Sequence, residues 1–394
     1  MKRLTETPFR GLTGELAHRW LRPWWIVALV AVIYMTAITM SAGGDPLALA
    51  RLGTRFLQGD PNGTEGYDGQ FVYYIARDPL NGWQQCDVPA YRYQRILYPL
   101  VGRLLAFGQE SLLPYSLALI NIAALALGTW LTERILLQYR MSRWYALTYG
   151  LYAGQLMAAG SLLTEPLAYA LCLAGVLAAQ RDRWRPAVLS FALGVLTKET
   201  ILVFVAGYLL FLLAPRDHAD PRQGALQGKR QWRRAAGLML GVGIPFLCWQ
   251  AVLWAWLGQP GLGSGGAGAT AWEILPFRGL WSVGTIDLRA LALLSVVAVP
   301  LAVIPAILSL WVTGRDLVRG RWHPFTTMLL ANALAMLFLP QSTYREPLAI
   351  LRLTTGLVVA AILYGAYRRS TRILNYTLLW LASLVFLTKE GPVP

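Results

Sequence analysis

The sequence is poor in charged residues, which make up 14% of its 394 residues, whereas a soluble domain usually carries about 25%. Cysteine is also scarce. Cys86 falls in an expected loop and Cys172 and Cys248 fall in apolar segments, so neither a disulfide framework nor a metal-ligand spacing is present. A Walker A motif, a DxD-type nucleotide-sugar site and a Rossmann half are missing too. The GLGSGG stretch at 261–266 matches G-x-G-x-x-G but follows no predicted strand, which excludes a dinucleotide site.

Apolar residues are abundant instead, at 56% of the chain, and they form long runs. A helix that crosses a bilayer needs about 20 such residues. We therefore predict an all-α polytopic membrane protein, a single integral-membrane domain over 1–394 with about 11 transmembrane helices. The predicted spans are 24–42, 112–132, 145–163, 166–180, 187–198, 200–214, 237–257, 290–313, 325–339, 347–366 and 373–388. The short pair at 187–214 is also consistent with a hairpin that does not fully cross.

The net charge of +15 has two explanations, nucleic-acid binding and membrane topology. With the N-terminus in the cytoplasm, every inside segment is basic, including the N-terminal segment 1–23 and the loop 215–236. The positive-inside rule accounts for this bias. We therefore expect a lipid bilayer, and no nucleic acid, as the partner of the positive charge.

Two outer loops are long, 43–111 and 258–289, and the second is rich in glycine. Within the first, aromatic residues recur at helical spacing in 67–78 and stop before a proline. In 91–108, arginines follow one side of a predicted helix and leucines follow another. We expect both segments to be helices that lie in the membrane interface.

Ionisable residues near bilayer depth cost a few kcal/mol each, so each is a functional candidate by default. Such residues occur in four separate outer segments: GYDGQFVYYIARDP, LLTEP, LTKE and TYREPLAILRL. They are Asp68, Asp78, Glu165, Lys198, Glu199, Arg345, Glu346 and Arg352. Their convergence on one side of the membrane is a stronger signal than any one of them.

Most of these candidates also have a purely structural interpretation. Asp68 precedes a helix and is a suitable N-cap, and Asp78 before Pro79 is typical of a turn. Neighbouring opposite charges are consistent with interfacial ion pairs, and outer-loop arginines with contacts to lipid headgroups. The residues concerned are Lys198 with Glu199, Arg345 with Glu346, and Arg92, Arg95 and Arg103. Arg352 lies inside an apolar run, which favours a functional role.

The available base on the outer side is a carboxylate, because His18, His218 and His323 all fall in inside segments. A sugar on polyprenyl phosphate leaves with its phosphate and needs cations rather than a general acid. The acceptor hydroxyl is a weak nucleophile and needs a positioned base. The residues thus favour sugar transfer with inversion. The alternatives are a transporter or flippase of polyprenyl-linked glycans, for which no internal repeat is found, and a non-catalytic partner in glycopolymer assembly.

Several motifs resemble those of a bacterial family described as cell-surface glycopolymer formation proteins. They are YDGQFVYYIARDP at 67–79, RYQRILYP at 92–99, LLTEP at 162–166, LTKE at 196–199 and YREPLAILRLTTGL at 344–357. More remotely, the chain is similar to the GT-C class of integral-membrane glycosyltransferases, including the GPI mannosyltransferase group. The resemblance covers residues from about 20 to about 390, and the YDGQF and RYQRILYP pair is its specific part.

The resemblance implies a GT-C-like helical fold in the bacterial inner membrane, with a periplasmic active site. The donor would be a polyprenyl-phosphate sugar and the acceptor a hydroxyl of a cell-surface glycan or glycolipid. Asp68 matches the GT-C base, and the donor phosphate would lie against Arg345, Arg352, Lys198, Arg95 and Arg92. The candidates for other substrate contacts are Tyr67, Gln70, Asp78, Glu165, Glu199, Tyr344 and Glu346. Some GT-C enzymes bind a divalent metal; this chain offers no clear ligand set, and metal use is left open.

Overall fold

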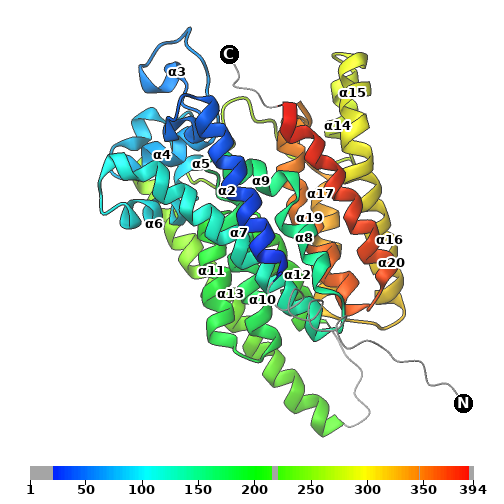
Figure 1. The fold of residues 1–394 in the computed structure, drawn as a ribbon. Coiled ribbons are helices and arrows are strands. Elements are labelled where there is room, and N and C mark those ends of the chain that lie inside the picture. The colour runs from blue at the N-terminus through cyan, green and yellow to red at the C-terminus, as the bar shows by residue number, and fades with distance from the viewer. Residues whose placement is uncertain (1–20, 215–220, 346, 390–394) are drawn as a thin grey trace, which may run out of the picture.

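The computed structural model describes residues 21–214, 221–345 and 347–389, with side chains described over 21–214, 228–344 and 349–387. Helix makes up 76% of it, and the described residues form no strand. Helices of very different lengths run side by side in a bundle (Figure 1). The prediction of an all-α chain is confirmed.

Five helical segments are long and apolar enough to cross a membrane among the residues described. They are built on α2 (Pro23–Ser41), α7 (Leu113–Gln138), α13 (Pro221–Leu257), the pair α15 (Leu288–Ala298) and α16 (Ile304–Val318), and α19 (Pro347–Tyr367). A π-helical turn at Val299–Val303 joins α15 to α16. These segments agree with five of the predicted spans and with a membrane protein.

Most of the other predicted spans fall on shorter helices, and the total of eleven crossings stays a prediction. The shorter apolar helices are α10 (Glu165–Gln180), α11 (Trp184–Thr197), α12 (Ile201–Leu213), α17 (Pro324–Leu337) and α20 (Thr371–Thr377), which continues as a 3-10 helix over Leu378–Lys389. The segment 187–214 forms two separate helices, α11 and α12, joined by a tight turn at Lys198–Thr200.

The segment 145–163 is not the continuous helix that hydropathy predicts. It forms a 3-10 turn at Arg143–Tyr145, α8 (Ala146–Gly150) and α9 (Ala153–Gly160). Nearly all of these residues are buried, and the side chain of Asn121 donates to the carbonyl of Leu163. Irregular backbone is tolerated at membrane depth where protein surrounds it and satisfies its polar groups, which is why an apolar run here does not require one straight helix.

Three loop predictions also change. The segment 91–108 is two helices, α5 (Pro89–Tyr93) and α6 (Leu97–Leu105). Arg95 lies in the turn between them and pairs with a distant residue described below. Residues 221–236 of the expected basic loop are the first turns of α13, and residues 215–220 lie outside the described residues. The glycine-rich loop 258–289 contains α14 (Arg278–Gly284).

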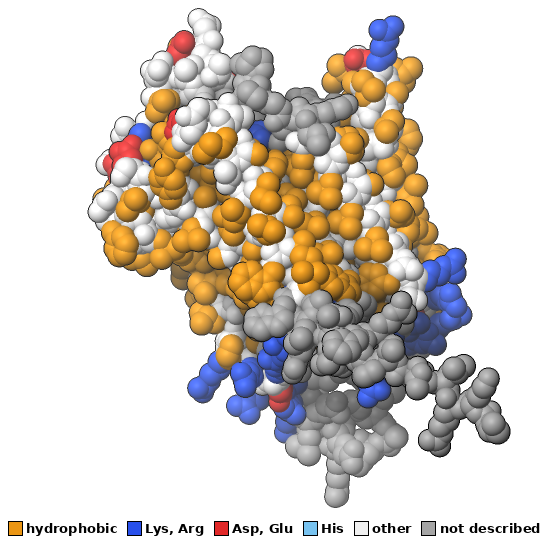
Figure 2. Space-filling model, viewed as in Figure 1, with side chains coloured by type: hydrophobic (Ala, Val, Ile, Leu, Met, Phe, Trp, Pro, Cys, Tyr) orange, Lys and Arg blue, Asp and Glu red, His pale blue; other side chains and the backbone are white. Residues whose placement is uncertain are grey.

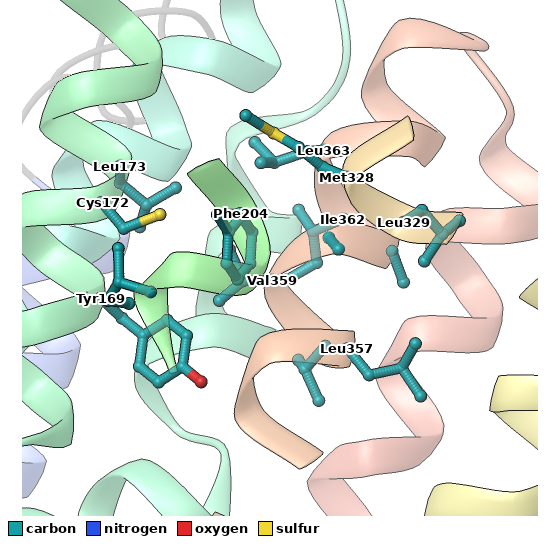
Figure 3. Packing of buried hydrophobic residues seen from close by; sticks show 14 of the residues in the cluster. Tyr169, Cys172, Leu173, Phe204, Met328, Leu329, Leu357, Val359, Ile362 and Leu363 are labelled. Atoms are coloured by element: carbon teal, nitrogen blue, oxygen red, sulfur yellow. The ribbon is translucent and has the colours of Figure 1, made fainter. Parts of the chain in front are cut away.

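The core lies between α10, α12, α17 and α19. Figure 3 shows Tyr169, Phe204 and Ile362 from three of these helices directed toward one another. Helix α19 is the central element, since 89% of its apolar window is buried against 17% for the peripheral α2. At Gly207 of α12, an added Cβ would lie 2.6 Å from the Cα of Met328. Small residues of this kind let membrane helices approach closely.

The two ends of the bundle differ in character. One end, here called the loop end, carries α3 (Thr54–Leu57), α4 (Gly69–Arg77), α5 and α6 (Figure 1). Lys and Arg side chains gather at the opposite, basic end, and apolar side chains cover much of the surface between (Figure 2). Short 3-10 turns at Pro46–Ala50, Gly82–Gln85 and Glu110–Leu112 and the helix α18 (Gln341–Arg345) complete the chain.

Candidate functional site

Asp68 is placed by a close backbone contact. It directly precedes Gly69, the first residue of α4, and a Cβ on Gly69 would lie 2.0 Å from the carbonyl oxygen of Ser161. Only glycine permits this approach, which brings Asp68 beside the segment that leads into α10. Asp68 occupies the N-cap position, but its backbone is helical and its side chain caps no N–H. The capping interpretation therefore does not describe its side chain.

Two arginines hold the Asp68 carboxylate. The Nη1 of Arg92 donates to Oδ1 and the Nη1 of Arg352 donates to Oδ2, both at 2.9 Å. Both arginine residues are about nine-tenths buried, whereas the Asp68 side chain is 30% exposed. Burial alone would raise the pKa of Asp68, but Arg92 and Arg352 outweigh it and hold that pKa well below its usual range. Asp68 is consequently ionised and open to water on one side.

Arg92 is itself fixed by Asp87. Its Nε donates to Oδ1 at 2.7 Å and its Nη2 to Oδ2 at 2.8 Å, a bidentate pair. The ring of Phe71 lies 4.2 Å from the guanidinium carbon. The backbone N–H of Ala267 also donates to Asp87 at 2.8 Å. The glycine-rich loop therefore contacts the site through Asp87, which sequence reasoning missed.

Arg352 connects Asp68 to a buried acid. Its Nε donates to Oε1 of Glu165 at 2.7 Å, and Lys198 donates to the same oxygen at 2.7 Å. Glu165, the first residue of α10, is fully buried, and its Oε2 has no hydrogen-bond partner. The Nη1 of Arg352 also donates to the hydroxyl of Tyr67 at 2.9 Å. Arg352 of α19 thus connects the long loop 43–111 to α10.

Arg95 and Glu199 form the other half of the cluster. The Nε and Nη2 of Arg95 donate to the Glu199 carboxylate at 2.9 and 2.6 Å, and Nη2 also donates to the Tyr91 hydroxyl. Burial would raise the pKa of Glu199, and Arg95 lowers it below its ordinary value. Lys198 does not pair with Glu199. Burial lowers the pKa of Lys198 to about 8, although Glu165 opposes this shift.

The cluster thus consists of carboxylates paired with Arg and Lys side chains, and it borders a small cavity. It contains Asp68, Asp87, Glu165, Glu199, Arg92, Arg95, Lys198 and Arg352. The cavity measures about 20 Å³ and is lined by Asp68, Arg92, Arg95, Glu165 and Arg352 among others. That volume suffices for about one water molecule. In this conformation the ion pairs close the site, so an anionic ligand would have to displace carboxylates to reach the arginines.

The remaining predicted site residues lie elsewhere. Asp78 is half-buried and accepts from the N–H groups of Leu80 and Asn81, so it stabilises a turn. Gln70 accepts from Gly53 and donates to the carbonyl of Glu65, which fixes the loop rather than the cavity. Tyr344 is buried with an unpartnered hydroxyl and does not line the cavity. The side chain of Arg345 and all of Glu346 lie outside the described residues.

Two residues that sequence reasoning missed carry a recognisable signal. Asp87 stands five positions before Arg92, and Tyr91 stands four positions before Arg95. Tyr91 and Arg95 have the spacing of neighbours on a helix, but Arg95 lies in the turn after α5, so their contact depends on that turn. Asp87 precedes α5, and its pairing depends on how the chain enters that helix.

The described residues do not fit a bound divalent metal. In the part of the chain that the structure describes, no group of three or more His, Cys, Asp or Glu residues is close enough to hold one. Each carboxylate of the cluster is already paired with Arg or Lys. Guanidinium and ammonium groups therefore supply the positive charge at this site.

Comparison with known proteins adds no relative. No protein-family model, curated protein or solved structure matches the chain. The resemblance to glycopolymer formation proteins and GT-C enzymes stays an expectation. The geometry of the cluster is the basis of the function proposed below.

Proposed function

We propose that the protein is an inverting glycosyltransferase that moves a sugar from polyprenyl phosphate to a hydroxyl of a glycan or glycolipid acceptor. One observation carries this proposal: the partly exposed Asp68 carboxylate is clamped between Arg92 and Arg352 at a cavity edge. A base and two phosphate-binding side chains thus stand in direct contact.

The clamp suggests how donor binding prepares the base. Arg92 and Arg352 keep the pKa of Asp68 low, which makes the free carboxylate a weak base. A donor phosphate that pairs with these arginines neutralises part of their charge. The pKa of Asp68 then rises toward its ordinary value. The base becomes effective only when the donor is in place.

The transfer step needs only the donor, the acceptor hydroxyl and Asp68. The acceptor oxygen forms a bond to the anomeric carbon on the face opposite the leaving group, and its proton passes to Asp68. The bond from the anomeric carbon to the phosphate oxygen breaks, and its electron pair stays on the polyprenyl phosphate. Arg92 and Arg352 stabilise the additional negative charge that develops there, with Arg95 and Lys198 close by.

An apolar route to the cluster supports a lipid-linked donor. A groove of about 1000 Å³ lies between α11 and α13 and is lined by Leu189, Leu193 and Leu196 among other residues. Leu196 and Pro245 also line an adjoining hollow of about 280 Å³, which extends to Ile96. Ile96 directly follows Arg95 of the cluster. A prenyl chain in this groove would hold its phosphate near the arginines.

The proposal extends to location. The loop end would face the periplasm of a bacterial inner membrane, with the basic end in the cytoplasm, as the positive-inside rule expects. The resemblance to GT-C enzymes implies a helical bundle with acidic side chains at one end, and the observed bundle with the Asp68 cluster at the loop end is consistent with it.

The test is sugar transfer by the purified protein in nanodiscs from a panel of radiolabelled polyprenyl-phosphate sugars. We expect transfer from one donor and its loss in Asp68→Asn, which keeps the shape of the side chain but removes the base. Asp78→Asn is the matched control, because Asp78 belongs to the same loop but only stabilises a turn. Full transfer by Asp68→Asn, or no transfer by the wild type with any donor of the panel, would contradict the proposal.

A second candidate function, lipid translocation, rests on the same groove. Its far end is basic and is lined by Lys229, Arg230, Arg233 and Arg234, so cations stand at both ends of an apolar path. A flippase would move labelled polyprenyl-phosphate sugar across liposomes without transferring the sugar. Translocation that persists in Asp68→Asn would favour this candidate over the transferase.

A further inference from the structure

A second polar cavity lies at the basic end, away from the candidate site. It measures about 430 Å³, within the range of small-ligand pockets. It opens between the end of α16, the end of α19 and the start of α20. Its polar lining includes Arg315, Asp316, Arg321, Tyr364, Arg368 and Arg369.

A buried carboxylate organises this cavity. Asp316 is only 3% exposed, and it accepts a hydrogen bond from the Tyr364 hydroxyl at 2.8 Å. It also forms ion pairs with Arg368, at 3.4 Å, and with Arg321, at 3.7 Å. One acid thus positions two arginines, and Arg315 and Arg369 add two more positive charges. The described lining carries a clear excess of positive charge.

Topology alone does not account for this arrangement. The positive-inside rule favours arginines at this end but does not require them around a hollow. Arg319 directly follows α16 and Arg372 belongs to α20, yet neither residue lines the cavity. Asp316 offsets one of the four positive charges, and the guanidinium groups around the hollow still repel one another unless a further anion lies between them. Phosphate oxygens match the guanidinium fork, as carboxylate oxygens do.

The surroundings favour a lipid as the source of the phosphate. Val312 and Ile373 give the cavity an apolar wall. Trp311 lies on α16, as Val312 does, and is 62% exposed. The Arg315 guanidinium carbon lies 5.8 Å from the centroid of the Trp311 ring. Because α16 belongs to an apolar helix long enough to cross a membrane, its exposed Ile307 would face lipid chains in a bilayer. Basic pockets between membrane helices bind anionic lipid headgroups in this way.

We propose that this cavity binds the phosphate of an anionic phospholipid, whose chains lie along the outer face of α16. Apolar side chains on this face of the bundle extend down to the arginines at the basic end (Figure 2). The proposal is independent of the glycosyltransferase proposal, since it uses none of the residues of the Asp68 cluster.

The experiment is native mass spectrometry of the purified full-length protein in neutral detergent with phosphatidylglycerol or phosphatidylcholine. We expect the wild type to retain phosphatidylglycerol preferentially. The double variant Arg315→Gln/Arg321→Gln should lose about tenfold in affinity, since it removes two charge-assisted contacts to phosphate. The control Arg319→Gln/Arg372→Gln removes the same charge at the same end and should bind like the wild type. Both pairs are exposed, and size-exclusion profiles check that each variant is folded.

Three results would overturn the proposal. Equal retention of both lipids by the wild type would show that no anionic headgroup is selected. An equal loss in the two double variants would assign the effect to general surface charge. Inorganic phosphate that binds with the same dependence on Arg315 and Arg321, while phosphatidylglycerol is not retained, would assign the site to a soluble phosphate.

Discussion

Arg352 of α19 and Asp68 before α4 are 284 positions apart in the sequence, yet the arginine Nη1 lies 2.9 Å from the aspartate Oδ2. The same arginine donates to Glu165 at the start of α10. One side chain from the most buried long helix therefore holds a loop acid and a helix acid together. The position of the proposed base depends on the packing of α19.

Arg352 should be sensitive to a substitution that keeps its charge. A lysine ammonium cannot reach Tyr67, Asp68 and Glu165 in one geometry. We expect Arg352→Lys to lower sugar transfer about 100-fold. Arg352→Gln leaves the buried Glu165 with only Lys198 and should cost about 3 kcal/mol of stability. Transfer assays and thermal unfolding in nanodiscs measure the two effects, and wild-type transfer by Arg352→Lys would contradict this role.

Lys198 should set an alkaline limit on activity. Its pKa is lowered to about 8, so its ammonium is present below that pH and is lost as the pH rises through it. Loss of the charge weakens the contact with Glu165 and the local attraction for phosphate. We expect kcat/KM to fall above about pH 8 in a profile from pH 6.5 to 9.5. A guanidinium group keeps its proton throughout this range, so Lys198→Arg should move the fall to higher pH.

A profile for Lys198→Arg that superimposes on the wild type would assign the fall to another group. Unchanged circular dichroism across the range is the control for unfolding.

Asp87 should couple the glycine-rich loop to Arg92. Asp87→Ala removes the bidentate partner of Arg92 and the acceptor of the Ala267 N–H. We expect faster proteolysis within 258–270 and a raised KM for the donor, because both the loop and Arg92 lose a fixed contact. Asp60→Ala is the control, since Asp60 is exposed and its side chain accepts a hydrogen bond from the nearby Asn62 N–H. Identical cleavage in wild type and Asp87→Ala would refute the coupling.

Gly69 should not tolerate a methyl group. Its Cβ would lie 2.0 Å from the Ser161 carbonyl oxygen, so α4 has to move away from the segment before α10. We expect Gly69→Ala to cost about 1–3 kcal/mol of stability, as overpacking usually does. Gly237→Ala in α13 meets nothing within 4 Å and should be neutral or slightly stabilising. Thermal unfolding of the two variants tests the contrast, and equal midpoints would contradict the close contact.

Hydropathy and residue type along the chain predict its helical membrane character and the segments that supply the cluster. Hydropathy is a local property, so the long apolar helices α2, α7 and α19 were predictable from their residues alone. The free-energy cost of a charged side chain in an apolar run is a local property too, so the sequence alone indicates a functional role for Arg352.

The packing of the helices in the tertiary structure determines which acidic and basic side chains pair. Glu199 pairs with Arg95, 104 positions away, and Lys198 with Glu165, so adjacent charges in LTKE do not bind each other. Contacts over such separations depend on how the helices pack, and spacing along the chain carries no information about them. The break between α5 and α6 and the irregular backbone of 145–163 have the same origin. Buried surroundings satisfy their backbone groups, and hydropathy cannot distinguish such a segment from a straight helix.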